Sequence, residues 1–156
     1  MAICNPGTLK GFLRKDERLL GLDVGTKTIG LALSDTRLMV ATPLSTIRRT
    51  RFTQDAAAVF REAVAHQVGA LVIGLPIPLD GGESPRSQSV RQFARNLLGV
   101  RDLPIAFWDE RLSTAAVERT MIEGDLTRKR RREIIDRTAA AYILQGLLDR
   151  LAYGGS

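Results

Sequence analysis

The chain has 156 residues, of which 44% are hydrophobic and only 5% aromatic, so we expect an ordinary-sized protein with a mostly aliphatic core. Its only cysteine, Cys4, excludes an internal disulfide and is typical of a protein in a reducing cytosol. No run of the sequence is long and apolar enough to span a membrane, so we expect a cytoplasmic protein.

The first half of the chain predicts a short tail followed by a β-meander. We expect residues 1–18 to be a flexible N-terminal tail, and residues 19–152 to form a single domain. The apolar run that ends at Asp23 predicts a buried strand, and residues 28–34 predict a second strand paired with it as a hairpin. A third strand over residues 39–48 is expected at the sheet edge, because Pro43 cannot donate a ladder hydrogen bond.

The second half alternates between helical and strand patterns. The expected helices are 53–67, one around 90–97 that stops at Gly99, one from Ser113 to Gly124, and 131–151; the expected strands are 70–74 and 104–108. A meander followed by alternating helices and strands predicts an α/β fold, with a central five-stranded mixed sheet flanked by helices on both faces. The Gly/Pro-rich segment 75–85 is expected to be either a ligand-contacting loop or an ordinary connection.

The positive charge of the chain is concentrated in one place. Most of the net charge of +6 comes from one unbroken run, which consists of Arg128, Lys129, Arg130, Arg131 and Arg132. Such a run favours a polyanionic partner, with nucleic acid ahead of an anionic membrane. The alternative is the solvated start of a helix.

Several carboxylates stand in apolar surroundings. Asp23 ends an apolar strand, Asp109 and Glu110 follow the apolar segment PIAFW, and Asp136 lies within IIDRTAAAYIL. Buried carboxylates are costly unless they are paired, and these acids can converge at one edge of the sheet. Carboxylate oxygens suit Mg²⁺ or Mn²⁺, and two such ions about 4 Å apart can promote hydrolysis of a phosphodiester. For each acid alone the alternative is structural: Asp136 can pair with Arg132, and Asp109 can cap the following turn.

The sequence offers few residues for other kinds of catalytic site. The single histidine, His66, lies near the end of an amphipathic helix, where a surface position is expected. The chain lacks the Cys and His clusters of zinc sites and the sequence of a nucleophile elbow.

Three segments together carry a family pattern. The first is GLDVGTKTIGLALSD, similar to G-x-D-x-G-x-K-R-I-G-x-A-x-S-D; the second is VIGLPIPLDGGESPRSQSVRQFARNL, similar to V-x-G-L-P-x-x-x-D-G and a following helix. The third is DERLSTAAVERTMIEGDLTRKRRREIIDRTAAAYILQGLLD, similar to D-E-R-x-[ST]-T, a basic run and I-D-x-x-A-A-x-x-I-L-Q. In this order, over residues 19–150, they resemble the YqgF/RuvX family of the RNase H-like superfamily.

The resemblance implies an RNase H-like fold and a divalent-metal nuclease that uses Mg²⁺ or Mn²⁺. By matched position, Asp23, Glu110 and Asp136 would be the metal-binding catalytic acids. Family members are associated with maturation of the 5′ end of precursor 16S ribosomal RNA, and some with Holliday-junction resolution. Two positions depart from the pattern: Thr28 stands where the family usually has Arg, and Pro78 stands where Asn is common. Lys27 is a candidate replacement for the missing arginine.

Nucleic acid would be held by the basic run and Lys27 through salt-sensitive phosphate contacts. Arg86 opens a helix beside segment 75–85 and is a further candidate contact, while Arg111 is expected either to touch nucleic acid or to pair with a site carboxylate. The expected partner is RNA, in precursor 16S rRNA or ribosomal particles.

Three other functions are considered. A resolvase of branched DNA would use the same acids and would usually need a homodimer, so the oligomeric state, monomer or homodimer, stays open. A nucleic-acid-binding module with a degenerate site is the non-enzymatic alternative. An actin-like ATPase, suggested by D-V-G-T alone, needs two large lobes, for which the chain is too short.

Overall fold

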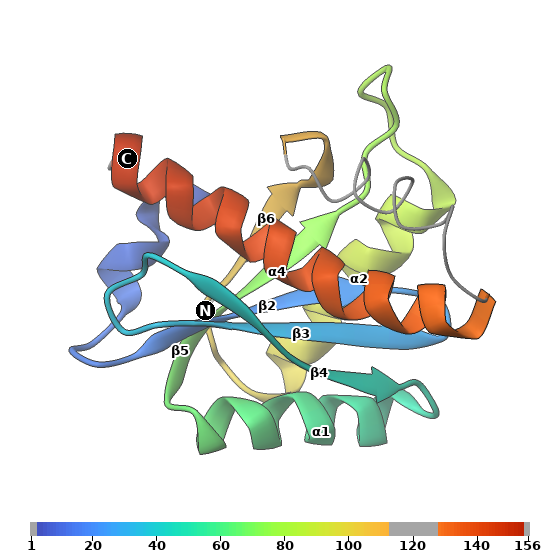
Figure 1. Ribbon diagram of the computed structural model, residues 1–156, viewed down its shortest axis with the longest axis horizontal. Coiled ribbons are helices and arrows are strands. Elements are labelled where there is room, and N and C mark those ends of the chain that lie inside the picture. The colour runs from blue at the N-terminus through green and yellow to red at the C-terminus, as the bar shows by residue number, and fades with distance from the viewer. Residues whose placement is uncertain (1–2, 113–127, 155–156) are drawn as a thin grey trace.

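The computed structural model describes residues 3–112 and 128–154, and in the last helix it describes the side chains of residues 139–153. In this part of the chain the strands form one sheet in the order β1-β6-β5-β2-β3-β4 (Figure 1). The elements in chain order are β1 (Ile3–Cys4), η1 (Pro6–Phe12), β2 (Arg18–Val24), β3 (Thr28–Ser34), β4 (Ala41–Arg48), α1 (Phe52–Ala65), β5 (Val68–Leu75), α2 (Pro85–Val100), β6 (Ile105–Asp109), η2 (Glu110–Leu112) and α4 (Arg128–Gly154).

The sheet is mixed, as the sequence predicted. Strands β2, β3 and β4 form an antiparallel meander, whereas β5 pairs parallel with β2, and β6 pairs parallel with β5. The predicted α/β architecture is therefore confirmed, but in the described part of the chain the sheet has six strands instead of the expected five, because β1 adds to it beside β6. Strand β4 lies at the edge of the sheet, the position that Pro43 allows.

Helices cover both faces of this sheet. Helices α1 and α2 pack on one face, where they bury Val59, Phe60, Val90 and Phe93 among the leucines and isoleucines of the strands. Helix α4 crosses the other face, with its C-terminal half packed through Ile143, Leu144 and their neighbours (Figure 1). Because side chains alternate along a strand, each central strand contributes to both layers. No helix among the described residues is both long enough and apolar enough to cross a membrane.

The N-terminal residues differ from the expected flexible tail. Ile3 and Cys4 add a short strand, β1, which pairs parallel with β6 opposite Ile105 and Ala106. The following 3-10 helix η1 is capped by the Asn5 side chain and buries Leu9 completely beneath α4. Fixing these residues is favourable because Leu9 removes its apolar surface from water.

Two helix predictions need comment. Helix α2 continues through Gly99 to Val100 instead of stopping at the glycine, since no backbone strain at Gly99 forces an end. Its start is fixed by a capping box, in which the Ser84 side chain accepts from the Ser87 backbone N–H while the Ser87 hydroxyl accepts from that of Ser84. The helix predicted from Ser113 to Gly124 lies outside the described residues.

Candidate active site

Asp23 lies on the α4 face of the sheet, near the carboxyl end of β2. Its neighbours Leu22 and Val24 point into the opposite layer, against α1 and α2. Asp23 pairs with Gly30 of β3, and only 5% of its surface is exposed. An apolar strand with fixed pairs on both sides therefore holds this carboxylate in one place.

The turn after Asp23 is tight and tied to the rest of the fold. The Gly25 backbone N–H donates to the Thr28 carbonyl oxygen at 2.8 Å, and a side chain at Gly25 would begin 3.0 Å from the same oxygen. Arg49 donates from its Nη1 to the Gly25 carbonyl oxygen at 2.6 Å, and it also pairs with Asp55 of α1 at 3.7 Å. Gly25 therefore closes a tight turn directly after Asp23.

Glu110 reaches the same face from the end of β6. In the parallel ladder of β2 and β5, Leu22 is opposite Ile73. The next residues along the two strands are Asp23 and Gly74, so these two are neighbours across the ladder. A Cβ at Gly74 would lie 3.1 Å from Oε1 of Glu110 and would collide with Cδ1 of Ile143. This Oε1 atom is buried. The carboxylate of Glu110 therefore occupies the space left by Gly74, whose backbone lies about one strand spacing of 4.8 Å from that of Asp23.

Asp136 belongs to α4, in the part of that helix whose side chains are outside the description. Gly21 of β2 brings the helix close, because a Cβ there would lie 2.9 Å from Cβ of Leu144 and 3.2 Å from the Ala140 carbonyl oxygen. Asp136 precedes Ala140 by one helical turn, and Asp23 follows Gly21 by two strand residues, each a step of about 6 Å. Figure 1 shows α4 running against the direction of β2, so both steps lead the same way. Convergence of Asp136 with Asp23 stays a prediction.

Asp109 has the structural role that the sequence left open. Its carboxylate accepts from the backbone N–H of Arg111 at 2.9 Å and from the Arg111 guanidinium at 2.7 Å. The hydrogen bond from Arg111 lowers the pKa of Asp109, and the same contact raises the pKa of Arg111. Asp109 thus caps the turn into η2, which is the structural alternative that the sequence offered for this acid. Glu110 is the acid directed at Gly74.

The Gly/Pro-rich loop after β5 approaches this ion pair. Gly81, with a φ of 84°, occupies the left-handed region, and a Cβ there would lie 3.9 Å from Nη1 of Arg111. Asp80 contributes to the raised pKa of Arg111, after the larger effect of the hydrogen bond to Asp109. The loop predicted to contact ligand therefore lies next to Arg111, and its tip residue Leu79 is 94% exposed.

The predicted nucleic-acid contacts occupy several elements. Lys27 is exposed in the β2–β3 turn, and Arg86 is exposed in the first turn of α2. Arg111 is engaged by Asp109, so its guanidinium is held in place at the rim of the site. Arg128 to Arg132 begin α4, and their side chains are outside the description. Contact of all these residues with nucleic acid stays a prediction.

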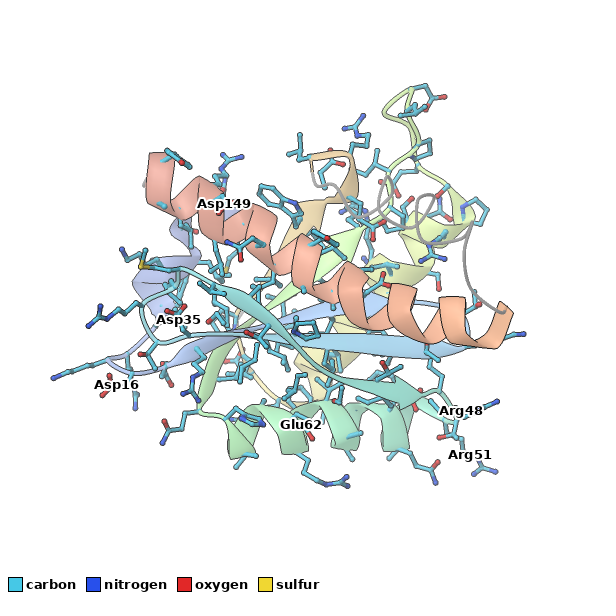
Figure 2. The ribbon with its side chains drawn as sticks, in the orientation of Figure 1. Asp16, Asp35, Arg48, Arg51, Glu62 and Asp149 are labelled. Carbon is cyan, nitrogen blue, oxygen red and sulfur yellow. The ribbon has the colours of Figure 1, made fainter. Side chains whose placement is uncertain are left out.

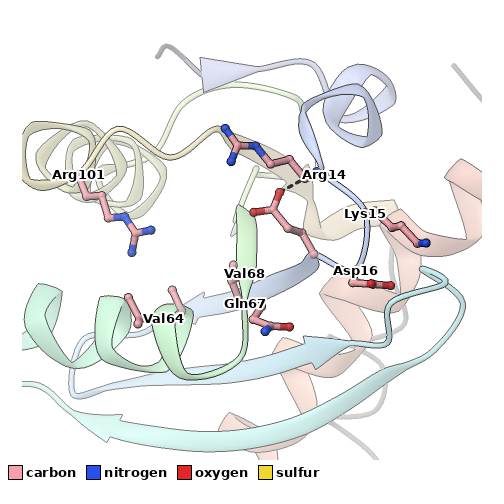
Figure 3. Close-up of a pocket in the computed structure, with 9 residues that line it drawn as sticks. Arg14, Lys15, Asp16, Val64, Gln67, Val68 and Arg101 are labelled. Carbon is pink, nitrogen blue, oxygen red and sulfur yellow. Dashed lines mark hydrogen bonds between the residues drawn. The ribbon is translucent and has the colours of Figure 1, made fainter.

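A separate hollow lies at the other end of β2. It is lined by Arg14, Lys15, Asp16 and Glu17 together with residues of α1 and β5, and Glu17 accepts from the Arg14 backbone N–H at 2.7 Å (Figure 3). Its lining mixes the cations Arg14, Lys15 and Arg101 with the acids Asp16 and Glu17, so it lacks the one-sided charge of a polyanion site.

Sequence reasoning missed the glycines that make room at the site. Gly21 and Gly74 interrupt apolar strands, and a lone glycine in a strand is a known sign of close backbone approach. It also missed Arg49, whose contact with Gly25 joins residues far apart in the sequence and leaves no local signal. Among the described side chains, no three His, Cys, Asp or Glu residues gather as a metal cluster, and the third expected acid, Asp136, is not among them.

Comparisons with known proteins agree with this geometry. The RuvX family profile, described as a Holliday junction resolvase, matches residues 17–150. The chain is 60% identical over 149 residues to a "Putative pre-16S rRNA nuclease" of Paramagnetospirillum magneticum, covering 96% of each chain. It is 59% identical over 159 residues to a protein of the same name from Rhodospirillum centenum, covering 99% of this chain and 85% of the relative.

A solved structure supports the fold. RuvC of T. thermophilus, in complex with a Holliday junction substrate, has a TM-score of 0.53 at 14% identity, covering 88% of this chain and 97% of RuvC. At that identity the likeness concerns the fold alone, and it confirms the RNase H-like architecture expected from the sequence. With a family profile that spans nearly the whole chain and relatives near 60% identity, this chain belongs to the RuvX family.

Proposed function

We propose that this chain is a divalent-metal-dependent nuclease that hydrolyses phosphodiester bonds at the α4 face of its sheet. One observation carries the proposal: Asp23 and Glu110 arrive from different elements at neighbouring positions, with Gly74 leaving the space between them. A fold gains no stability from gathering carboxylates in a nearly dry place unless cations compensate them. Two carboxylates at neighbouring and mostly buried positions offer the oxygen ligands that a divalent cation needs.

The donor set fits a hard cation. Asp23 and Glu110 offer carboxylate oxygens, the ligand type that Mg²⁺ and Mn²⁺ prefer, and Asp136 would complete the set. A divalent ion held there supplies an activated water and stabilises the charge that develops on the leaving oxygen. Strand pairing holds the backbone of Asp23, and the space above Gly74 receives the carboxylate of Glu110, so both acids are placed before substrate arrives. Pre-positioned groups reduce the reorganisation needed at the moment of reaction.

The proposed physiological substrate is precursor 16S ribosomal RNA, cut near its 5′ end in the cytoplasm. Support comes from the names of the most similar relatives, which describe pre-16S rRNA nucleases. The family description instead favours a Holliday junction, which supports branched DNA as the second candidate substrate. Resolution of a junction needs two symmetric cuts and therefore a homodimer, whereas trimming of an RNA end is possible for a monomer.

A side-by-side cleavage assay separates these substrates. The full chain is incubated with Mg²⁺ or Mn²⁺ and either a 5′-extended 16S RNA fragment or a four-way DNA junction, and its oligomeric state is measured by sedimentation. Metal-dependent cutting of the RNA near the mature 5′ end, with the junction left intact, is the expected result. Paired symmetric cuts in the junction by a dimer would contradict the RNA assignment.

The non-enzymatic alternative makes a different prediction. A binding module with a degenerate site would hold RNA without a need for metal. Mn²⁺ at a hundred times its dissociation constant should stabilise the proposed nuclease by about 2.7 kcal/mol, because it binds only the folded state. An unchanged thermal midpoint with Mn²⁺, together with tight RNA binding and no cleavage, would favour the binding module.

A further inference from the structure

The turn end of the β2–β3 hairpin carries Lys27, which the sequence already suggested as a contact, and lies near two arginines that the sequence pattern did not single out. Lys27 is exposed in the hairpin turn, Arg48 is exposed at the end of β4, and Arg51 is exposed at the start of α1. Figure 2 shows Arg48 and Arg51 at the same end of the molecule, both extending away from the sheet. We call these three residues the hairpin-end cluster.

Strand register places Arg48 on the face of the candidate site. In the β3–β4 ladder Thr28 pairs with Arg48, and the preceding pair is Ile29 with Ile47. Ile29 and Ile47 both pack in the layer of α1 and α2. Since side chains alternate along a strand, Thr28 and Arg48 belong to the opposite face, which is also the face of Asp23.

The distance from Arg48 to the acids suits a substrate contact. Asp23 pairs with Gly30, and Gly30 pairs with Thr46, two residues before Arg48. Two strand spacings of about 4.8 Å and two residues of about 3.4 Å separate the backbones of Asp23 and Arg48 by roughly 12 Å. A nucleic acid strand lying over Asp23 therefore passes within reach of the long Arg48 side chain.

Among the residues that the structure describes, the charges beside this cluster leave it positive. Asp55 is the nearby acid among the described residues, and it is buried, accepting from the Thr50 backbone N–H and pairing with Arg49. Arg49 is occupied by Asp55, by the Gly25 carbonyl oxygen and by the ring of Phe93, at 5.2 Å. For Arg48 and Arg51, no ion pair is found within the described part of the chain. Two consecutive arginines thus have different roles, with Arg49 fixing the turn and Arg48 facing solvent.

We propose that the hairpin-end cluster is a phosphate-binding surface for the substrate RNA, with Arg48 as its principal contact on the strand that enters the active site. Arg48 pairs with Thr28 across the β3–β4 ladder and lies on the same face of the sheet, so it offers a positive charge where Thr28 has none. This inference rests on the proposed nuclease function and deepens it by assigning residues that hold the substrate. Contacts of this kind fix the register of the backbone and carry no base preference.

Salt-dependent RNA binding tests the inference. Anisotropy of a fluorescent 16S 5′-extension RNA is measured without divalent metal, at several salt concentrations, for the wild type, Arg48→Gln and Arg37→Gln. Arg37 is the matched control, because it is exposed in the turn at the opposite end of β3 and β4. For Arg48→Gln we expect weaker binding and a log–log salt slope shallower by about 0.7 to 0.9, the value of one lost phosphate contact. Arg37→Gln should keep the wild-type slope, and Arg48→Lys should restore most of the slope lost in Arg48→Gln.

The outcomes separate this inference from the function on which it rests. If the wild type cleaves RNA and Arg48→Gln keeps the wild-type slope, the cluster is not a phosphate surface and the nuclease assignment stands. If the wild type neither binds nor cleaves RNA, both proposals are wrong. Thermal midpoints of all three variants are compared first, since Arg48 is exposed and Arg48→Gln should leave the midpoint unchanged; a large loss would show that Arg48 is structural and would overturn the inference.

Discussion

Gly21→Ala tests whether the close approach of α4 to β2 holds the site together. The new Cβ would lie 2.9 Å from Cβ of Leu144 and 3.2 Å from the carbonyl oxygen of Ala140. Neither atom is the far end of a flexible side chain, so the helix itself must move. Overpacking of this kind costs about 1 to 3 kcal/mol. Replacing a strand glycine returns about 0.5 to 1 kcal/mol by reducing the entropy of the unfolded chain.

Because the backbone of α4 must shift, we expect an overpacking cost of about 2 to 3 kcal/mol, the upper part of that range. The net loss is then about 1 to 2.5 kcal/mol of unfolding free energy, or a thermal midpoint lower by roughly 2 to 10 °C. Urea denaturation and thermal unfolding measure this loss directly. Gly99→Ala is the control, since nothing lies within 4 Å of a Cβ at Gly99 and its helix should tolerate alanine. If Gly21→Ala is as stable as the wild type, α4 does not lie against β2 at this glycine and the placement of Asp136 loses its support.

Three further changes follow from particular contacts. Gly74→Ala fills the space that Glu110 uses, so metal-dependent cleavage should fall even at temperatures where the variant is fully folded. Cleavage at the wild-type rate would refute the placement of Glu110. Ser84→Ala removes the cap of α2 and should cost about 1 kcal/mol in urea denaturation, whereas no change would show the cap to be dispensable. Asp109→Asn should destabilise the protein at pH 7, and the difference from the wild type should shrink as the pH falls below about 4. The hydrogen bond from Arg111 lowers the pKa of Asp109 in the folded state, so the stability that Asp109 contributes is present above its unfolded pKa and is lost as the pH falls through the folded pKa. A pH-independent difference in urea midpoint would contradict that assignment.

The sequence was most informative where the physical cause is local. An apolar strand that ends in Asp23, followed by Gly25, predicts a fixed carboxylate beside a tight turn, and both features are present. Alternation of strand and helix periods predicted the mixed sheet, and Pro43 predicted the edge position of β4. The order of motifs, rather than any one of them, identified the family.

Features that depend on distant contacts were not accessible in this way. The family pattern selected Glu110 over Asp109, but the physical reason was hidden, because both acids follow the same strand and only Glu110 meets the distant Gly74. The pairing of Ile3 and Cys4 with β6 joins opposite parts of the chain, and a two-residue strand has too few side chains to show a period. The different roles of Arg48 and Arg49 follow from β4 register and from the position of Asp55.

The central claim is that Asp23 and its partner acids bind a divalent cation and cut RNA. The most direct test is the single-turnover rate of cleavage of a 5′-extended 16S RNA in saturating Mg²⁺ by Asp23→Asn. Asp149→Asn is the control, because Asp149 lies on the C-terminal part of α4, where it accepts from Gln145 at 2.9 Å (Figure 2). We expect Asp23→Asn to lose more than about a hundredfold in rate, the upper end of the effect that is typical of residues that only orient metal ligands, while Asp149→Asn keeps the wild-type rate. A folded Asp23→Asn protein that cleaves at the wild-type rate would contradict the proposed site.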